Sequence, residues 1–492
     1  MLTFLFTVIL AAFLTGCDPS SDDNPELSIT KTTPLNRVTG VPIQSAVSAI
    51  FSTDADLSTL TTATFTLTAA AGPVTGTITY NAADKKVTFS PVSPLGKITL
   101  YTATLTTGIK DTNGTALSAA YTWTFTTGPL ISAKEDHTLI LKSDGTLWSC
   151  GLNDYGQLGD GSLIDRSTPV QVTGLTGAPV SSAAAGSYHS IALRSDGTVL
   201  AWGENGDGQL GDGNPSWAHG LGPVQAKGLT GITALAAGYW HSLALKNDGS
   251  VWAWGANGKG QLGNGTYDEQ SVPMQVSGLA GITAIAAGTE FTLALKSDGT
   301  VWAWGDDTYG QLGDNNDGSV ETYRNAPVPV SGLTGISAIS AGYDHSLFLK
   351  NDGTVWTCGR NDTLQCGVPY DNAVNNGHIL VPVQVASLSG ITAIAAGGWH
   401  NLVLKSDGAV WAWGSNYYRS LGSSGNSDVN YETPVQTSSL TTGTVTAVAA
   451  GLNHSLALMS DGSVWTWGDN GKGQLGDTTI LQNDTPEDIG VY

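Results

Sequence analysis

The feature that most constrains this chain is a unit that recurs seven times between residues 130 and 492. Each copy follows the plan A-x-A-A-G-x-x-H-S-L-A-L-K-S-D-G-T-V-W-A-W-G-x-N-x-x-G-Q-L-G. A segment of variable length and P-V-Q-V-x-G-L-T-G-I-T come next. The glycine of the D-G pair recurs every 50 to 55 residues, at Gly145, Gly197, Gly249, Gly299, Gly353, Gly408 and Gly462. Repeats of this length with strand-like alternation are typical of β-propellers, so we expect a seven-bladed β-propeller.

Each copy predicts the four antiparallel strands of one blade. They are the segments of the T-A-I-A-A-G, H-S-L-A-L-K, T-V-W-A-W-G and P-V-Q-V types. The D-G pair predicts a tight turn between the second and third strands. We call the end of the first strand the top, which places the G-x-x-H link and the N-x-x-G segment on the top face. The copies differ in length mainly in the segment after G-Q-L-G, which also lies on the top face. Binding sites tend to lie on loops of a rigid scaffold, so we expect binding on this face.

The two ends of the repeat region predict how the ring closes. The chain ends at Pro486–Tyr492, in the fourth strand of the last copy, and no further first strand follows it. Leu130–Asp136 provides a strand of that type at the beginning. We therefore expect one blade to contain both ends, which would remove open sheet edges.

Residues 29–129 form a second region, in which apolar residues alternate with threonine. Strands are predicted around Phe65, Ile78, Val87, Tyr101 and Tyr121, with turn residues between them. About 100 residues of short strands predict an antiparallel β-sandwich. The stretches VTGTITYNAADKKVTFSPVSPL and YTATLTTGIKDTNGTALSAAYTWTFTTG resemble the Ig-like domains of bacterial surface and S-layer proteins. We interpret this domain as a spacer. The expected fold class is therefore all-β, a propeller preceded by a small Ig-like β-sandwich.

The first residues predict targeting to the cell envelope. Met1–Leu14 is apolar but too short to span a bilayer, as in a signal peptide. The following Leu14-Thr15-Gly16-Cys17 resembles the lipobox of bacterial lipoproteins, which implies cleavage before Cys17 and lipidation of that residue. We expect residues 1–16 to be the signal peptide and residues 17–28 an acidic tether. The alternative is an ordinary cleaved signal in which Cys17 occurs by chance.

Charge excludes one class of partner. The chain carries 41 acidic and 20 basic residues, a net charge of −21. An acidic surface repels phosphate backbones, so we expect no nucleic-acid partner and contact with the membrane only through the lipid anchor.

The repeat plan resembles the regulator-of-chromosome-condensation repeat family, whose fold is a seven-bladed propeller. The resemblance covers about three-quarters of the chain and is specific for the fold. It is weak for function, because the family includes exchange factors, light sensors and enzyme inhibitors.

Candidate binding residues lie where otherwise similar copies differ. The two residues between Gly and His mix large aromatics with acids, unlike a core or a plain turn, which suits a protein or glycan surface. The candidates from these pairs are Tyr188, Tyr239, Trp240, Glu290, Tyr343, Asp344 and Trp399. The N-x-x-G segments add Tyr155, Tyr309, Tyr417 and Tyr418. The alternative is that these aromatics only cover the mouth of the central channel.

Other polar residues have plainer explanations. Histidine recurs at 137, 189, 241, 345, 400 and 454, with Phe291 in the fourth copy. The six histidines could bind a metal or could pack between blades, and Phe291 favours packing. Cys150, Cys358 and Cys366 stand where other copies have tryptophan or leucine, so we interpret them as small buried hydrophobic residues. The alternative is a Cys358–Cys366 disulfide, which would suit an oxidising envelope. We expect no metal, no cofactor and no catalytic residue.

Three possibilities remain for the function. The favoured one is a lipid-anchored binding module of the cell envelope, whose partner is an envelope or extracellular protein, or a glycan. The alternatives are an envelope enzyme acting on polysaccharide, which should gather chemically paired residues at one point, and a purely structural surface protein.

Overall fold

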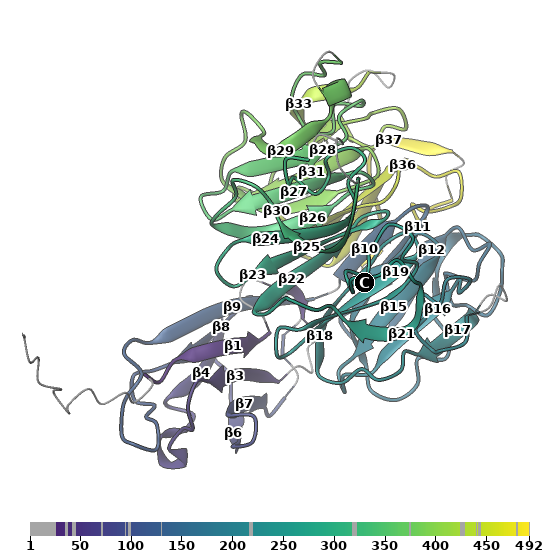
Figure 1. The fold of residues 1–492 in the computed structure, drawn as a ribbon. Helices are drawn as coiled ribbons and strands as arrows, with labels where there is room; N and C mark the ends of the chain where they lie inside the picture. Colours follow the sequence, from purple (N-terminus) through teal and green to yellow (C-terminus); the bar gives the residue numbers. More distant parts are fainter. Residues whose placement is uncertain are drawn as a thin grey trace, which may run out of the picture.

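The computed structural model confirms an all-β chain (Figure 1). It describes residues 26–491 except 35–37, 42–45, 70–71, 94, 97–99, 129, 216–219, 317–321, 373–374, 424–428, 439, 441–443 and 479–480. The signal segment and Cys17 lie outside these residues. In the described part, the helices are single 3-10 turns, η1 (Leu57–Thr59) and η2 (Asn375–Gly377), and none is long and apolar enough to cross a membrane.

The N-terminal domain is a sandwich of two sheets, with strand orders β1-β3-β7-β6 and β2-β9-β8-β4-β5. Its strands are β1 (Ile29–Thr33), β2 (Val38–Val41), β3 (Val47–Phe51), β4 (Phe65–Ala69), β5 (Gly72–Pro73), β6 (Gly76–Asn81), β7 (Lys86–Pro91), β8 (Leu100–Leu105) and β9 (Tyr121–Thr127). The predicted alternation places Phe65, Phe89 and Trp123 in the core between the sheets. The ring centroid of Phe65 lies 5.7 Å from that of Phe89 and 5.8 Å from that of Trp123.

Seven four-stranded sheets form the blades, each with its strands in chain order. Blades one and two are β10 (Leu130–Lys134), β11 (His137–Leu141), β12 (Leu147–Gly151), β13 (Arg166–Gln171), β14 (Val180–Ala185), β15 (His189–Arg194), β16 (Val199–Gly203) and β17 (Gly220–Gln225). Blades three and four are β18 (Ile232–Ala237), β19 (His241–Lys246), β20 (Val251–Gly255), β21 (Gln270–Gln275), β22 (Ile282–Ala287), β23 (Phe291–Lys296), β24 (Val301–Asp306) and β25 (Tyr323–Pro329).

The last three blades follow the same plan. Blades five and six are β26 (Ile336–Ala341), β27 (His345–Lys350), β28 (Val355–Gly359), β29 (Ile379–Gln384), β30 (Ile391–Ala396), β31 (His400–Lys405), β32 (Val410–Gly414) and β33 (Tyr431–Gln436). Blade seven is β34 (Val445–Ala450), β35 (His454–Met459), β36 (Ser463–Asp469) and β37 (Gln482–Val491). All pairings within blades are antiparallel, as the pattern predicts.

The D-G turns need glycine for a conformational reason. In blade three, Gly249 has φ 80°, in the left-handed region that glycine adopts without a Cβ penalty. The carboxylate of Asp248 accepts the backbone N–H of Ser250 over 2.9 Å, which closes the turn. The same arrangement recurs in the other blades, so the bottom face is a ring of short, rigid turns.

Neighbouring blades pack through the tryptophan of the third strand. Trp254 of blade three is fully buried, and its indole N–H donates to the carbonyl of Gln209 in blade two over 2.8 Å. A Cβ on Gly211 would lie 2.8 Å from the indole nitrogen, which explains the last glycine of G-Q-L-G. Cys150 and Cys358 take the tryptophan position in blades one and five and are also buried.

The prediction that one blade contains both chain ends is wrong. β10 pairs with β11 in blade one and β37 pairs with β36 in blade seven, so neither blade needs a strand from the other end. Side chains close the ring instead: the Thr138 hydroxyl donates to the carbonyl of Gln474 over 2.8 Å. The Ser190 hydroxyl donates to the carbonyl of Gln157 in the same way, over 2.8 Å, between blades one and two. The closing seam thus uses the contacts of the other seams.

The sandwich meets the bottom of the propeller. Lys31 on β1 donates from Nζ to the carbonyl of Lys246, next to the bottom turn of blade three, over 3.3 Å. Burial in this contact lowers the pKa of Lys31 to about 8, although the nearby Asp248 carboxylate opposes the shift. Figure 1 shows the sandwich at the lower left, beside the propeller. The top face lies at the other end of the blades.

Candidate functional site

The first strand of each blade carries the chain to the top face, where two residues link it to the second strand. A glycine precedes these two residues in six copies, because a side chain there would collide with the ring that follows. A Cβ on Gly238 would lie 2.2 Å from the imidazole of His241 and 2.7 Å from the carbonyl of Gly288 in the next blade. The link is therefore held rigidly, and the two residues between Gly and His keep a fixed place on the top face.

The six repeat histidines bind the neighbouring blade. Each Nε2 pairs with a hydroxyl or amide oxygen of the next blade at 2.7 to 3.2 Å. The pairs are His137–Ser190, His189–Ser242, His241–Thr292, His345–Asn401, His400–Ser455 and His454–Thr138. Among the described residues, no group of three His, Cys, Asp or Glu side chains is placed to hold a metal ion. The histidines form a belt of inter-blade contacts, as the packing interpretation predicts.

Some of these contacts are Ser–His pairs, which sequence reasoning missed because the partners lie about 50 residues apart. His189 Nε2 and Ser242 Oγ are 2.8 Å apart, but both side chains are fully buried. The serine hydroxyl donates to the carbonyl of Gln209 over 2.9 Å. A nucleophile needs access to its substrate, so the geometry suits packing and not acyl transfer.

The three repeat cysteines are buried free thiols, and the structure does not pair Cys358 with Cys366. The Cys358 thiol faces the carbonyl of Gln311 at 3.6 Å, and the Cys366 thiol faces the carbonyl of Arg360 at 3.3 Å. Burial raises the pKa of Cys150 to about 12 and that of Cys366 further. These thiols therefore behave as small hydrophobic groups.

The structure brings most of the predicted aromatics into one continuous path across the top face. Tyr188 lies at its centre, with ring centroids 4.9 Å from Tyr155, 5.2 Å from Tyr239 and 5.0 Å from Trp240. The hydroxyls of Tyr188 and Tyr239 are 3.0 Å apart. Tyr343 extends the path, 6.4 Å from Tyr239. These side chains are half-buried against one another, so each leaves part of its surface open on the top face.

The path continues from blade five into blade six. Tyr343 lies 5.5 Å from Trp399, and the guanidinium of Arg360 lies 4.6 Å from the Trp399 centroid. The same guanidinium lies 4.8 Å from Tyr309, so it is held between two rings. Its charge is balanced by Asp344 at 3.3 Å and Asp362 at 2.6 Å. Arg360 is a site residue that sequence reasoning missed, because only one copy has arginine there.

The mouth of the channel carries a second feature that the sequence pattern did not reveal. Blade one has Lys134 where the other copies have glycine, and its Nζ donates to the carbonyl of Ala287 in blade four over 2.8 Å. The adjacent Glu135 accepts a hydrogen bond from the hydroxyl of Tyr343 in blade five. These two side chains therefore connect blades on opposite sides of the axis. An alignment of the seven copies shows that lysine replaces glycine at position 134. It does not show that Lys134 and Glu135 contact blades four and five.

Acidic groups around the mouth are crowded and desolvated. Burial raises the pKa of Glu135 to about 7, and the neighbouring Asp136 adds to the shift. Burial also raises the pKa of Asp136 and of Asp344 to about 6. Burial also raises the pKa of Glu290, whose charge contributes in turn to the raised pKa of Tyr239 in the path. These carboxyl groups form an acidic rim around the aromatic path, in which burial favours the protonated form.

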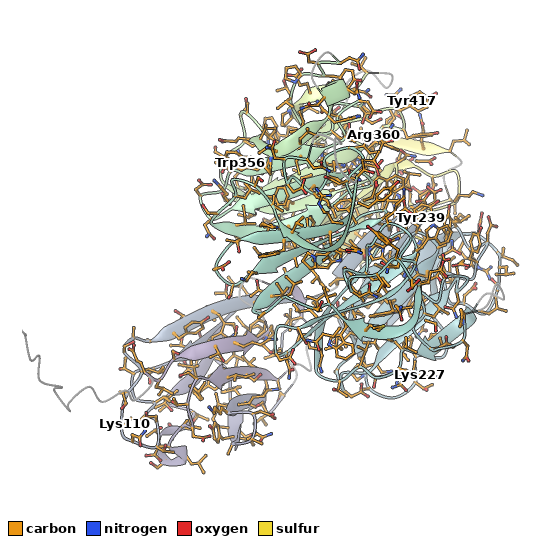
Figure 2. All side chains as sticks on the ribbon, viewed as in Figure 1. Lys110, Lys227, Tyr239, Trp356, Arg360 and Tyr417 are labelled. Atoms are coloured by element: carbon orange, nitrogen blue, oxygen red, sulfur yellow. The ribbon has the colours of Figure 1, made fainter. Side chains whose placement is uncertain are left out.

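Tyr417 and Tyr418 lie apart from the centre of the path and are more exposed. Their ring centroids are 5.1 Å apart, and they border a cavity of about 450 Å³ that Trp399 also lines. Figure 2 shows Tyr239, Arg360 and Tyr417 along one side of the propeller, away from Trp356. The predicted site residues thus fall into one central network and one outer cleft on the same face.

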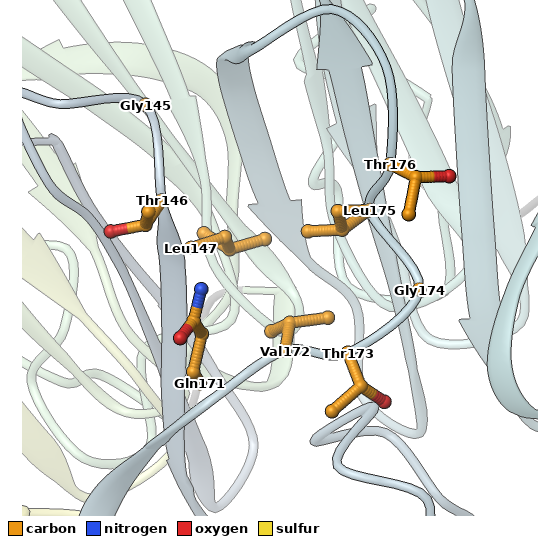
Figure 3. A pocket seen from close by; sticks show the side chains of 9 residues that line it. All are labelled: Gly145, Thr146, Leu147, Gln171, Val172, Thr173, Gly174, Leu175 and Thr176. Atoms are coloured by element: carbon orange, nitrogen blue, oxygen red, sulfur yellow. The ribbon is translucent and has the colours of Figure 1, made fainter.

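A second cavity lies on the bottom, between the blade-one turn at Gly145 and the loop 171–176. Its volume is about 340 Å³. Leu147, Val172 and Leu175 face one another across it (Figure 3). None of the candidate binding residues lines it, and its walls combine aliphatic and threonine side chains with no titratable group. It offers no chemistry beyond packing.

Comparisons with known families agree with this architecture. A model described as an RCC1-like domain matches residues 216–490. Models of the regulator of chromosome condensation (RCC1) repeat match residues 144–193 and, in two stretches, 130–157 and 180–209. A model described as a bacterial Ig-like domain matches residues 23–127. The resemblances of the repeat region to the RCC1 repeat family and of residues 29–129 to a bacterial Ig-like domain are therefore confirmed.

Individual proteins extend the match. The ultraviolet-B receptor UVR8 of Arabidopsis thaliana is 32% identical over 367 residues, which cover 73% of this chain and 69% of the receptor. The E3 ubiquitin-protein ligase HERC2 of Homo sapiens is 32% identical over 355 residues, but these span only 6% of the ligase. The structure of Prp20p from Saccharomyces cerevisiae has a TM-score of 0.59 at 27% identity, covering 66% of this chain and 81% of Prp20p. The family model spans more than half of the chain, and the chain belongs to the RCC1-like domain family.

Proposed function

We propose that this chain is a lipid-anchored protein of the bacterial cell envelope whose propeller binds a protein partner through its top face. The Ig-like domain serves as the spacer between anchor and propeller. The partner is an envelope or extracellular protein. The observation that carries the proposal is the aromatic path with its acidic rim, which runs across the face opposite the sandwich.

The composition of this path supports a protein partner. Tyrosine and tryptophan dominate interface hot spots, since they bury large areas and keep a polar group at one end. Tyr239 and Trp240 provide large rings with a polar group on the top face, and their ring centroids are 4.7 Å apart. Prp20p, which shares the fold, is described with its binding to Gsp1p and histones. Protein binding is therefore compatible with this scaffold.

The test places a photo-crosslinking residue at position 240 on the top face or at Ser195 on the bottom face. We expect crosslinks to a partner from position 240 only. The Trp240→Ala change should weaken binding of that partner by at least ~10-fold, because truncating an aromatic anchor costs ~2 kcal/mol or more. Calorimetry measures the loss, and an unchanged melting temperature shows that the fold is intact. Equal crosslinking from both faces, or unchanged affinity, would contradict the proposal.

The anchor has its own test. Changing Cys17 to Ala removes the thiol that the lipobox sequence implies as the acylated group. We expect the variant to move from the membrane fraction to the soluble fraction, because lipid chains supply ~0.8 kcal/mol of membrane affinity per buried CH₂. Cell fractionation and metabolic labelling with a palmitate analogue measure the change. Ser20→Ala in the tether is the matched control, and membrane association that survives Cys17→Ala would refute lipid anchoring.

A further inference from the structure

The outer cleft of the top face has a polar and aromatic lining, unlike the cavity on the bottom. It lies where blades five, six and seven meet and has a volume of about 450 Å³. The loop after β28 contributes one wall, and the loop after β32 contributes another. The lining residues are Arg360, Asp362, Thr363, Trp399, Ser415, Tyr417, Tyr418, Asn430 and Asn453. This volume lies within the usual range of small-molecule sites.

Every lining side chain is either aromatic or able to form hydrogen bonds, and none is aliphatic. The guanidinium of Arg360 and the amides of Asn430 and Asn453 are donors. The carboxylate of Asp362 and the amide oxygens are acceptors, and the hydroxyls of Thr363 and Ser415 can do both. Sites for hydrophobic small molecules are lined mostly by apolar side chains, whereas this set matches a ligand covered with hydroxyl groups. Each hydroxyl needs a donor and an acceptor at once.

The aromatic part of the cleft offers open ring faces. Tyr417 is 66% exposed and is the most exposed aromatic side chain in the described part of the chain. Tyr418 is 37% exposed, and the two rings meet at 73°. An exposed tyrosine ring gains by covering an apolar patch of a ligand, while its hydroxyl stays in water. The faces of pyranose rings carry such patches of C–H groups.

The charge balance of the cleft favours a neutral ligand. Arg360 Nη2 lies 2.6 Å from an oxygen of Asp362, and Nη1 lies 3.3 Å from an oxygen of Asp344. Two carboxylates therefore surround one guanidinium, which leaves no free positive charge for a sulfate, phosphate or carboxylate. The rings of Tyr309 and Trp399 hold the guanidinium in place, so it cannot turn away from its carboxylates.

We propose that this cleft binds a neutral pyranose unit of an extracellular polysaccharide, stacked on Tyr417 and hydrogen-bonded to Arg360, Asp362 and the two asparagines. The polysaccharide chain would continue outward over Tyr418. This activity goes beyond the protein-binding function, because its stacking residue, Tyr417, lies in the outer cleft, although the cleft shares Arg360 and Trp399 with the end of the aromatic path. The two sites lie on one face and can be separated by mutation.

Calorimetry with the full chain tests the proposal. The probes are four neutral hexasaccharides, namely cello-, malto-, manno- and chitohexaose, with oligogalacturonate as the anionic comparison. We expect binding of at least one neutral probe and none of oligogalacturonate. The Tyr417→Ala change should weaken this binding by at least ~10-fold, in line with the loss of one buried aromatic contact. Tyr417→Trp should preserve it, since the indole also offers a face for stacking.

Two control variants separate this proposal from the protein-binding function. Tyr121→Ala removes a tyrosine that is 38% exposed in the Ig-like domain and should leave sugar binding unchanged. Trp240→Ala should weaken binding of the protein partner and leave sugar binding unchanged. The proposal fails if no neutral probe binds, if oligogalacturonate binds as well, or if Tyr417→Ala has no effect. It also fails if Tyr417→Ala weakens only the protein partner, because the cleft would then belong to the protein interface.

Discussion

Lowering the pH below about 4 is expected to unfold the propeller cooperatively, with proton uptake by the histidine belt. Burial lowers the pKa of five belt histidines from 6.5 to about 3, and that of His345 to about 4. These histidines stabilise the fold fully above the unfolded pKa, and the contribution is lost as the pH falls toward the folded pKa. Each proton taken up on unfolding changes stability by ~1.4 kcal/mol per pH unit. Over a few pH units, the stability lost through six such histidines exceeds the ~5–15 kcal/mol free energy of unfolding of a typical domain.

Carboxylates oppose this effect at intermediate pH. Burial raises the pKa of several top-face acids, so the folded state holds protons that the unfolded chain releases. Stability from these groups falls as the pH rises from about 4 toward their folded pKa. Their folded pKa values are about 7 for Glu135, Glu204 and Asp307 and about 6 for Asp136 and Asp344. The two effects offset each other near pH ~5, and the histidines dominate below pH ~4.

The His400→Phe change tests the source of the acid sensitivity. Phe291 occupies the same position in blade four, where it is fully buried, so the ring site accepts phenylalanine. Ser455, the partner of His400, keeps its hydrogen bond to the carbonyl of Ser420. We expect the slope of unfolding free energy against pH to decrease by ~1.4 kcal/mol per pH unit between pH ~4 and ~5. Urea titrations at a series of pH values measure it, and an unchanged slope would show that the belt does not control acid unfolding.

Replacing Trp254 with alanine is expected to destabilise the propeller by ~3–5 kcal/mol. The indole is fully buried at the seam between blades two and three, so its loss leaves a cavity and removes one of the two hydrogen bonds that the carbonyl of Gln209 accepts, the other coming from Ser242. Gly211 cannot fill the space, because it has no side chain. The midpoint and slope of urea unfolding measure the change.

Trp252 is the matched control, two residues earlier on β20. It is half-buried, and the ammonium of Lys246 lies 5.2 Å from its ring. We expect Trp252→Ala to cost less than half as much, since much of its surface already faces water. The stability loss from Trp254→Cys should fall between those of Trp252→Ala and Trp254→Ala, because Cys150 and Cys358 fill the same position in two blades. Equal losses from Trp252→Ala and Trp254→Ala would show that the seam does not depend on the buried indole.

Several features could be predicted because they depend on neighbours in the sequence. Alternating residues around Leu243 and Ala244 predict a strand, and Asp248-Gly249 predicts the turn that ends it, whatever the rest of the chain does. Seven copies of such a hairpin predict seven blades. The substitution of His by Phe291 indicated packing, because one belt position tolerates a group that cannot bind metal.

What the sequence determined by itself is therefore the blade, its two faces and the seven-fold repetition. Only the tertiary structure decided how the blades meet: the ring closes by side-chain contacts such as Thr138 to Gln474, not by a shared blade. It also decided that Lys134 reaches Ala287 across the axis and that Arg360 lies between two rings. The physical reason is that strands and turns form from hydrogen bonds between residues close in the chain. Contacts between blades depend instead on the curvature of the closed ring, which no single repeat encodes.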